Sequence, residues 1–168
     1  MEVKIKKLSE DAVITQYMTD GAVGFDIVSL TEGVIPPARV GYFKLEDGKE
    51  VECSFEEAEY NKVIFGSLVV DTGLAFELPQ GYELEIRGRS GLGFVHDIIA
   101  HNGTIDSDYR GEVKVKLWNL SDKSFKVEKG MRVAQGVIKP VVCPTFVEVE
   151  ELQETVRGTK GFGSTGLT

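Results

Sequence analysis

The fold is decided by the stretch LAFELPQGYELEIR, residues 74–87. Apolar side chains recur at every second position on both sides of Pro79-Gln80-Gly81, which is the period of a β-strand with one buried face. Proline presets φ at a turn, and glycine accepts a backbone that other residues avoid. The stretch therefore predicts two short strands that run in opposite directions about a tight turn.

Two further segments repeat this pattern. Apolar residues alternate with lysines over residues 113–117, which predicts a strand with one buried and one solvated face. Residues 125–127 and 133–138 flank the turn Glu128-Lys129-Gly130, which predicts another strand pair. Because the patterned segments are short and are separated by turn residues, the sequence is typical of an all-β domain.

Size and charge narrow the classes of function. The chain has 168 residues, 42% of them hydrophobic, which is enough for one buried core, so a single domain is expected. A formal net charge of -8 argues against a broad electrostatic grip on nucleic acid, and no direct nucleic-acid partner is expected. No stretch approaches the roughly 20 apolar residues of a membrane span, and the start lacks the pattern of a secretory signal. No membrane contact is expected, and the default compartment is the cytoplasm.

An acidic insert at about residues 38–65 interrupts the pattern. It contains the tight-turn dipeptide Asp47-Gly48, which predicts a local hairpin. Ser54 and Glu57 have the spacing of a capping box, so a helix of two or three turns is expected to run toward Val63, as the only helix of any length. A solvated surface excursion is the favoured interpretation of this insert, and a binding element for a protein partner is the alternative.

The densest polar cluster spans residues 102–112. Asp106 and Asp108 bracket a serine there, and an extended turn can present one acid inward and one outward. An ordinary Asp-rich turn is an alternative of equal weight. Gly103 and Gly111 flank the cluster and let the backbone approach a ligand closely, which favours a site.

Two glycine-rich segments also carry polar groups. Residues 88–93, GRSGLG, offer an arginine fork, a hydroxyl and backbone amides that suit phosphate oxygens, although plain turns at strand ends more often have this composition. Residues 157–166, RGTKGFGSTG, formally match a dinucleotide fingerprint, but that fingerprint needs a helix after it, and none is expected here. A basic pair and a lone Phe162 in such a tail favour a lid that closes over an anionic, aromatic ligand.

Five blocks, in this order, resemble the motifs of the homotrimeric dUTP diphosphatases, the dUTPase family. They are residues 22–27 (AVGFDI), 89–93 (RSGLG), 103–112 (GTIDSDYRGE), 132–135 (RVAQ) and 157–166 (RGTKGFGSTG). The resemblance covers about residues 20–166 apart from the insert, and the third and fifth blocks are very specific to the family. The insert resembles extra segments of phage and viral members, so a phage-type enzyme is expected.

The resemblance implies a role for each residue that matches a motif. Asp106 matches the general base that activates the water attacking the α-phosphorus, and Tyr109 matches the aromatic residue that leaves no room for a 2′-hydroxyl. Asp26 matches the aspartate that contacts Mg2+, the implied cofactor, through water. The implied substrate-binding set is Arg89, Ser90, Gly91, Asn102, Gly103, Tyr109, Gln135, Arg157, Phe162, Gly163, Ser164 and Thr165.

The same resemblance divides this set among the parts of the substrate dUTP. Residues 89–91 and Gln135 are implied to contact the phosphate chain, and Arg157 with residues 163–165 to clasp the β- and γ-phosphates. Phe162 is implied to cover the uracil. Recognition of the uracil itself is expected from backbone groups before Asp106, with Asn102 as a candidate side chain.

The implied fold is a jelly-roll-like β-barrel in a homotrimer. Residues 1–156 are expected to form the barrel domain, and residues 157–168 a flexible arm that closes an active site. The implied reaction is the Mg2+-dependent hydrolysis of dUTP to dUMP and pyrophosphate, which limits uracil in DNA and supplies dUMP. Two alternatives stay open: a dCTP deaminase-like hydrolase, and a nucleotide-sensing binding protein that acts through the insert. Asp106 argues against a purely binding role, because a binder needs no water-activating carboxylate.

Overall fold

Most of the regular structure in the computed structural model, which describes residues 1–159 and 161, is β-strand, as expected. The strands are β1 (Lys4–Lys7), β2 (Phe25–Val28), β3 (Gly33–Ile35), β4 (Arg39–Glu46), β5 (Lys49–Glu52), β6 (Tyr60–Ile64), β7 (Gly66–Asp71), β8 (Leu74–Glu77), β9 (Tyr82–Arg87), β10 (Ile98–Ala100), β11 (Gly103–Ile105), β12 (Lys114–Asn119), β13 (Phe125–Val127) and β14 (Arg132–Pro140). Helical structure in the described residues is confined to α1 (Ser90–His96) and a 3-10 turn, η1 (Phe55–Glu57). Neither helix is long and apolar enough to cross a membrane.

One hydrophobic core holds the body of the molecule together. The two larger sheets of the body have the strand orders β10-β12-β7 and β11-β9-β14-β2, and β1-β8 and β13-β3 are separate two-stranded sheets. Ile27, Leu84, Leu117 and Val127, which come from both larger sheets and from β13, are at most 1% exposed. Burying a side chain of this size contributes about 1.5–3 kcal/mol, so this core fixes the strands that carry the site.

Residues 74–87 form the predicted strands and turn, but the two strands do not pair. The amide of Tyr82 donates to the carbonyl of Pro79 over 3.2 Å, and Gly81 has a φ of 83°. However, β8 pairs with β1, whereas β9 lies between β11 and β14. The strand pair expected from residues 125–138 needs the same correction, because β13 pairs with β3, and β14 pairs with β2 and β9. Both turns therefore pass the chain from one sheet to another.

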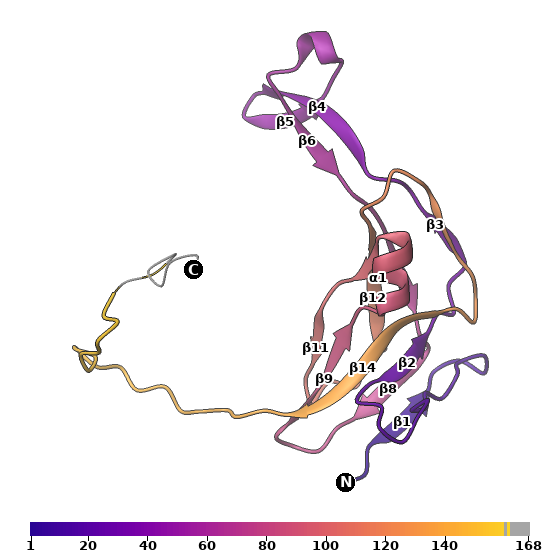
Figure 1. The fold of residues 1–168 in the computed structure, drawn as a ribbon, viewed down its shortest axis with the longest axis vertical. Coiled ribbons are helices and arrows are strands. Elements are labelled where there is room, and N and C mark those ends of the chain that lie inside the picture. The colour runs from indigo at the N-terminus through magenta and orange to yellow at the C-terminus, as the bar shows by residue number, and fades with distance from the viewer. Residues whose placement is uncertain (160, 162–168) are drawn as a thin grey trace.

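The insert forms a separate small sheet that projects from the body, with β4 between β5 and β6 (Figure 1). The predicted hairpin is confirmed: Asp47 and Gly48 have φ of 50° and 74° and join β4 to β5. Phe43 is the buried large apolar residue of this sheet, and its ring stacks on Tyr60 with Lys62 above it. The insert therefore has its own small apolar contact, separate from the main core.

The prediction of a helix of two or three turns that runs toward Val63 is wrong. Residues Phe55–Glu57 make one 3-10 turn, Ser54 makes no side-chain capping bond, and β6 follows. The amides of Cys53 and Glu59, on either side of this turn, donate to carbonyls of β4 over 2.9 Å each. Pairing with β4 thus outweighs the local helix signal, and the α-helix of the described chain is α1 instead.

A close crossing of backbones fixes the base of the insert. A Cβ added at Gly66 would lie 2.6 Å from the carbonyl carbon of Pro36, and closer still to its oxygen. The amide of Ala38 donates to the carbonyl of Ser121 over 2.8 Å, which ties the entry of the insert to the body. A side chain at position 66 would therefore force these two segments apart.

The chain leaves the body after β14. Residues 141–159 run away from the barrel with neither helix nor strand (Figure 1). Val142, Phe146 and Leu152 in this arm are 91%, 92% and 86% exposed. Exposure of large apolar side chains to water is unfavourable, so the composition of this arm favours packing against another protein surface.

Candidate active site

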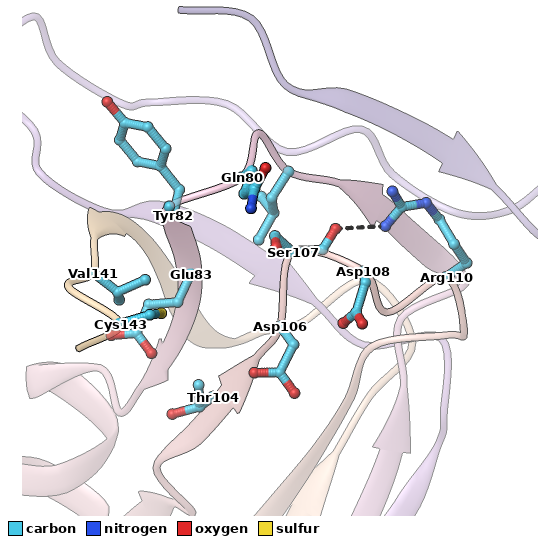
Figure 2. A pocket seen from close by; sticks show the side chains of 12 residues that line it. Gln80, Tyr82, Glu83, Thr104, Asp106, Ser107, Asp108, Arg110, Val141 and Cys143 are labelled. Atoms are coloured by element: carbon cyan, nitrogen blue, oxygen red, sulfur yellow. Dashed lines mark hydrogen bonds between the residues drawn. The ribbon is translucent and has the colours of Figure 1, made fainter. Parts of the chain in front are cut away.

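Asp106 lies where the chain leaves the end of β11 (Figure 2). Ile105 is the last residue of β11 to pair with β9, so the sheet fixes the point from which the carboxylate projects. Two open clefts meet at Asp106. The first, of about 850 Å³, is also lined by Asp108 and Arg110, and the second, of about 360 Å³, by Tyr109 and Glu112. The carboxylate is exposed, so it can reach a water molecule in either cleft.

The loop after Asp106 is closed by its own hydrogen bonds. The amide of Tyr109 donates to the carbonyl of Asp106 over 3.2 Å. Nη1 of Arg110 donates to the carbonyls of Ser107 and Tyr109 over 2.7 and 3.0 Å, the first of which Figure 2 draws. These bonds turn the chain back beside Asp106 and place Tyr109 next to it.

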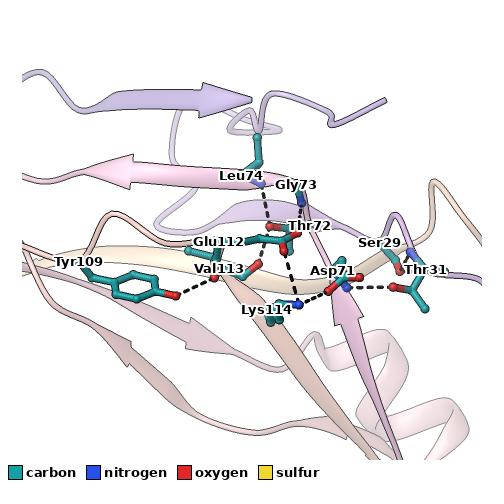
Figure 3. A network of polar contacts seen from close by, with 10 residues as sticks. All are labelled: Ser29, Thr31, Asp71, Thr72, Gly73, Leu74, Tyr109, Glu112, Val113 and Lys114. Atoms are coloured by element: carbon teal, nitrogen blue, oxygen red, sulfur yellow. Dashed lines mark hydrogen bonds and ion pairs between the residues drawn. The ribbon is translucent and has the colours of Figure 1, made fainter. Parts of the chain in front are cut away.

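A polar network ties this loop to the turn between β7 and β8 (Figure 3). The hydroxyl of Tyr109 donates to the carbonyl of Glu112 over 3.1 Å, and the Glu112 carboxylate accepts from the amide of Gly73 over 2.8 Å. Lys114 lies 2.7 Å from the carboxylate of Asp71 and 3.5 Å from that of Glu112. Hydrogen bonds with Asp71 and Glu112, that of Asp71 the stronger, raise the pKa of Lys114, so the ammonium stays charged.

A second polar group lies on β2, β14 and the start of α1. Nε of Arg89 lies 3.0 Å from Oδ1 of Asp26, and Nη1 of Arg132 lies 3.0 Å from Oδ2. The Asp26 side chain is only 14% exposed. Arg89 also donates to the carbonyl of Arg132 over 3.0 Å, and both arginines line an open cleft of about 720 Å³. Guanidinium groups held this way present their remaining N–H donors to an anion.

A β-bulge brings Arg132 and Gln135 to the same side of β14. Residues three apart in a regular strand face opposite ways, but the register of β14 against β2 shifts between Arg132 and Ala134. Gln135 is then directly opposite Asp26, and its Nε2 donates to the carbonyl of Gly88 over 2.9 Å. The resemblance assigned no role to Arg132, although the fourth block contains this residue.

Ser90 and Gly91 form the first turn of α1. Leu92 is the buried residue of this helix and the His96 ring contacts that of Phe125, while Ser90 and Gly91 stay exposed. A Cβ added at Gly91 would meet nothing within 4 Å. The backbone at Gly91 is therefore open to a ligand that approaches from solvent.

The Asp106 group and the arginine group do not meet within one chain. Ile105, next to Asp106, pairs with Leu84 where β11 meets β9. Gln135 pairs with Asp26 where β14 meets β2, two strands further along the same sheet. In the described part of the chain, the cleft beside the arginines shares no lining residue with the two clefts at Asp106. The residues expected to act on one substrate thus occupy two separate surfaces.

The remaining expected residues are spread over the chain. Gly103 begins β11, and a Cβ there would make an ordinary 3.6 Å contact with Ile86. Asn102 is exposed and lines neither cleft at Asp106, and Arg157 lies in the extended arm. The other four lie outside the described residues: Phe162, Gly163, Ser164 and Thr165.

The donor set does not form a metal cage. No group of three or more His, Cys, Asp and Glu side chains that could hold a metal ion occurs among residues 1–159 and 161. Both carboxylate oxygens of Asp26 face a guanidinium, which offsets the charge. A divalent cation here would therefore depend mainly on the oxygens of a bound polyphosphate and on its own waters, as Mg2+ does in many sites.

Comparison with known proteins agrees with this picture. The model of the dUTPase family matches residues 53–166. The deoxyuridine 5'-triphosphate nucleotidohydrolases of Nautilia profundicola and of Helicobacter pylori strain 26695 are 46% and 42% identical, and the alignments cover at least 99% of each chain. The solved dUTPase of Staphylococcus bacteriophage 80alpha with dUPNHPP is 25% identical, with a TM-score of 0.77 and 99% coverage of both chains.

The strand architecture and the likeness to the solved phage dUTPase define an all-β protein of the jelly-roll type. Within that class, the chain belongs to the dUTPase family. The expected phage origin is not supported, because bacterial relatives at 41–46% identity align over the whole chain, insert included.

Proposed function

We propose that this protein is a dUTP diphosphatase, which hydrolyses dUTP to dUMP and pyrophosphate. The observation that carries the proposal is the position of Asp106, an exposed carboxylate at a fixed strand end beside Tyr109. Full-length relatives named deoxyuridine 5'-triphosphate nucleotidohydrolase support the choice of substrate. Such an activity limits uracil incorporation into DNA and supplies dUMP for dTTP synthesis.

Asp106 acts as the general base. Its carboxylate takes a proton from water while the water oxygen bonds to the α-phosphorus and the bond to the β-phosphate oxygen breaks. The products are dUMP and pyrophosphate.

The arginine group binds the phosphate chain. Arg89, Ser90, Gly91 and Gln135 are the proposed contacts, because they gather at one end of β14 beside the open backbone of Gly91. Arg132 joins them through Asp26. Arg157, with Gly163, Ser164 and Thr165, is proposed to clasp the β- and γ-phosphates, and Phe162 to cover the uracil.

The nucleoside occupies the cleft of about 360 Å³ that Asp106 and Tyr109 share. Tyr109 forms the wall against the sugar, and it excludes the 2′-hydroxyl of a ribonucleotide. The neighbouring strand β11, with Gly103, presents its backbone groups to the uracil, and Asn102 precedes it. Sugar selection is thus assigned to a side chain and base selection mainly to the backbone.

A homotrimer would bring the two surfaces together. Phe94 of α1 and Phe146 of the arm are 91% and 92% exposed, which favours burial against another copy. In this proposal residues 1–156 form the trimerising domain, with the insert at about 38–65, and residues 157–168 close the site of a neighbouring subunit. Each site then combines Asp106 of one copy with the arginines of another.

The proposed cofactor is Mg2+. When bound with the triphosphate, it offsets the charge on the phosphate oxygens. Asp26 would contact it through water only, because guanidinium groups already face both of its oxygens. We place the reaction in the cytoplasm, where free deoxynucleotides are present.

The test is pyrophosphate release with Mg2+ from dUTP, dTTP, dCTP and UTP in parallel, with EDTA as the metal control. Release from dUTP alone supports the proposal. Ammonia from dCTP would instead support a deaminase, and silence on all four would favour a nucleotide-binding protein that acts through the insert.

A further inference from the structure

We propose that Gly111 and Glu112 are specificity-determining positioning residues, which hold the ring of Tyr109 rigidly enough to exclude a ribonucleotide. The inference rests on the proposed function, because it takes Tyr109 as the wall of the nucleoside cleft. It adds a mechanism for that role, in which neither residue needs to touch the reacting atoms.

Gly111 makes room for the ring. A Cβ added there would lie 2.5 Å from Cζ and 2.9 Å from Cε2 of Tyr109, and closer still to its hydroxyl oxygen. Gly111 is not among the residues with positive φ, so its backbone does not itself require glycine. The ring of Tyr109 therefore occupies the volume that a side chain at position 111 would fill.

Glu112 anchors the same ring to the core. Its carbonyl accepts the hydroxyl proton of Tyr109 over 3.1 Å, and its carboxylate accepts from the amide of Gly73 over 2.8 Å (Figure 3). Gly73 sits between Thr72 and Leu74, which are 1% and 2% exposed. Because that turn is buried, the acceptor of the Tyr109 hydroxyl cannot move without moving the core.

This anchoring matters because Tyr109 itself is 45% exposed. An unanchored ring on an open cleft could swing aside to admit one extra hydroxyl, and apolar sites reject an added hydroxyl only weakly, by about 10²-fold at most. A ring that packs against Gly111 and whose hydroxyl is hydrogen-bonded to the Glu112 carbonyl cannot swing aside in this way. Selection for deoxyribose then depends on these two residues as much as on Tyr109.

Two matched pairs of variants test the inference. Gly111→Ala adds the Cβ under the ring, and Gly21→Ala adds one where nothing lies within 4 Å. Glu112→Ala removes the acceptor for Gly73, whereas Glu112→Gln keeps an amide oxygen that can accept the same bond. For each variant the ratio of kcat/KM for dUTP and UTP is measured, together with the ratio of Kd for dUDP and UDP and the unfolding midpoint in urea.

We expect Gly111→Ala and Glu112→Ala to lower the dUTP/UTP ratio of kcat/KM about tenfold and to raise the dUDP/UDP ratio of Kd about tenfold, because the sugar wall becomes movable. Gly21→Ala and Glu112→Gln should keep both ratios close to wild type. Unchanged ratios in a folded Gly111→Ala and in Glu112→Ala would overturn the inference. If Gly111→Ala does not fold, the Glu112 pair decides the question.

The Kd ratio separates this inference from the proposed function. A wild-type protein that turns over no dUTP, yet binds dUDP more tightly than UDP, contradicts the proposed reaction. Loss of that preference in Glu112→Ala, but not in Glu112→Gln, would still support the positioning role.

Discussion

Arg89 and Asp26 lie far apart in the sequence, yet Nε of the arginine is 3.0 Å from Oδ1 of the aspartate. Arg132 occupies the other carboxylate oxygen at the same distance. One carboxylate on β2 therefore holds two cations, which come from the turn before α1 and from the bulge in β14. The arrangement concentrates positive charge at one place in a chain whose formal net charge is -8.

Replacing Asp26 by asparagine should destabilise the protein. Two guanidinium groups would lose a shared charged acceptor, and because both are partly exposed the expected loss is about 1–2 kcal/mol of unfolding free energy. Urea denaturation measures it, with Asp122→Asn, at an exposed loop position, as the control. A stability equal to wild type would mean that solvent replaces the carboxylate without cost.

Replacing Asp106 by asparagine should separate binding from turnover. The amide keeps the shape of the side chain but cannot accept the proton of water, so kcat for dUTP should fall by about 10²- to 10⁴-fold. The affinity for dUDP, measured by calorimetry, should stay near that of wild type. Near-normal turnover would remove Asp106 from the catalytic role.

Replacing Gly66 by alanine should loosen the base of the insert. The new Cβ would lie 2.6 Å from the Pro36 carbonyl carbon, and a backbone neighbour cannot move aside cheaply. We expect a loss of about 1–3 kcal/mol in unfolding free energy, measured in urea. Gly21→Ala is the matched control, and equal stability of the two variants would show that the crossing relaxes freely.

Low pH should destabilise the sheet that carries the site, because the ion pairs of Glu85 are lost in acid. Hydrogen bonds from Arg87, and then from Lys139, lower the pKa of Glu85. A carboxyl whose pKa is lower in the folded protein stabilises the fold above its unfolded pKa, and this stability is lost as pH falls through the folded pKa. Glu85→Gln should therefore show a shallower loss of stability in acid than wild type.

Urea midpoints measured across the acid range test this expectation. Glu151→Gln, in the exposed arm, is the matched control and should follow the wild-type pH dependence. If Glu85→Gln and wild type lose stability in parallel, the ion pairs of Glu85 contribute nothing to folding.

The period of the apolar residues predicted where strands occur, but not how they pair. Val113, Val115 and Leu117 are at most 1% exposed, as their alternation indicates. The alternation on each side of Gly81 was equally informative about burial, yet β8 and β9 join different sheets. Pairing depends on partners distant in the sequence, which a local pattern does not contain.

The helices were misplaced for two physical reasons. Ser54 and Glu57 have a helix-start signal, but hydrogen bonds to β4 on both sides of the turn favour the sheet. The sequence of α1 contains Gly91 and Gly93, and glycine costs about 1 kcal/mol in a helix interior relative to alanine, so no helix was expected there.

The sequence likewise predicted the residues of the site only in part. Resemblance assigned Arg89 and Gln135 to the phosphate chain and Asp26 to Mg2+ through water, and the structure brings these three residues together. It gave no role to Arg132, although the fourth block contains this residue, and in the structure a bulge turns Arg132 to the same side as Gln135. A bulge adds one residue to a strand without changing its composition, so the sequence carries no clear signal of it.

The distance between Asp106 and Arg89 in one chain also has a genetic meaning. If each site takes these residues from different copies, an allele that lacks the carboxylate and an allele that lacks the arginine damage different halves of the same site. Mixed assemblies of Asp106→Asn and Arg89→Ala chains would then contain some sites with both native residues. Two alleles that are inactive alone should complement each other when they are expressed together.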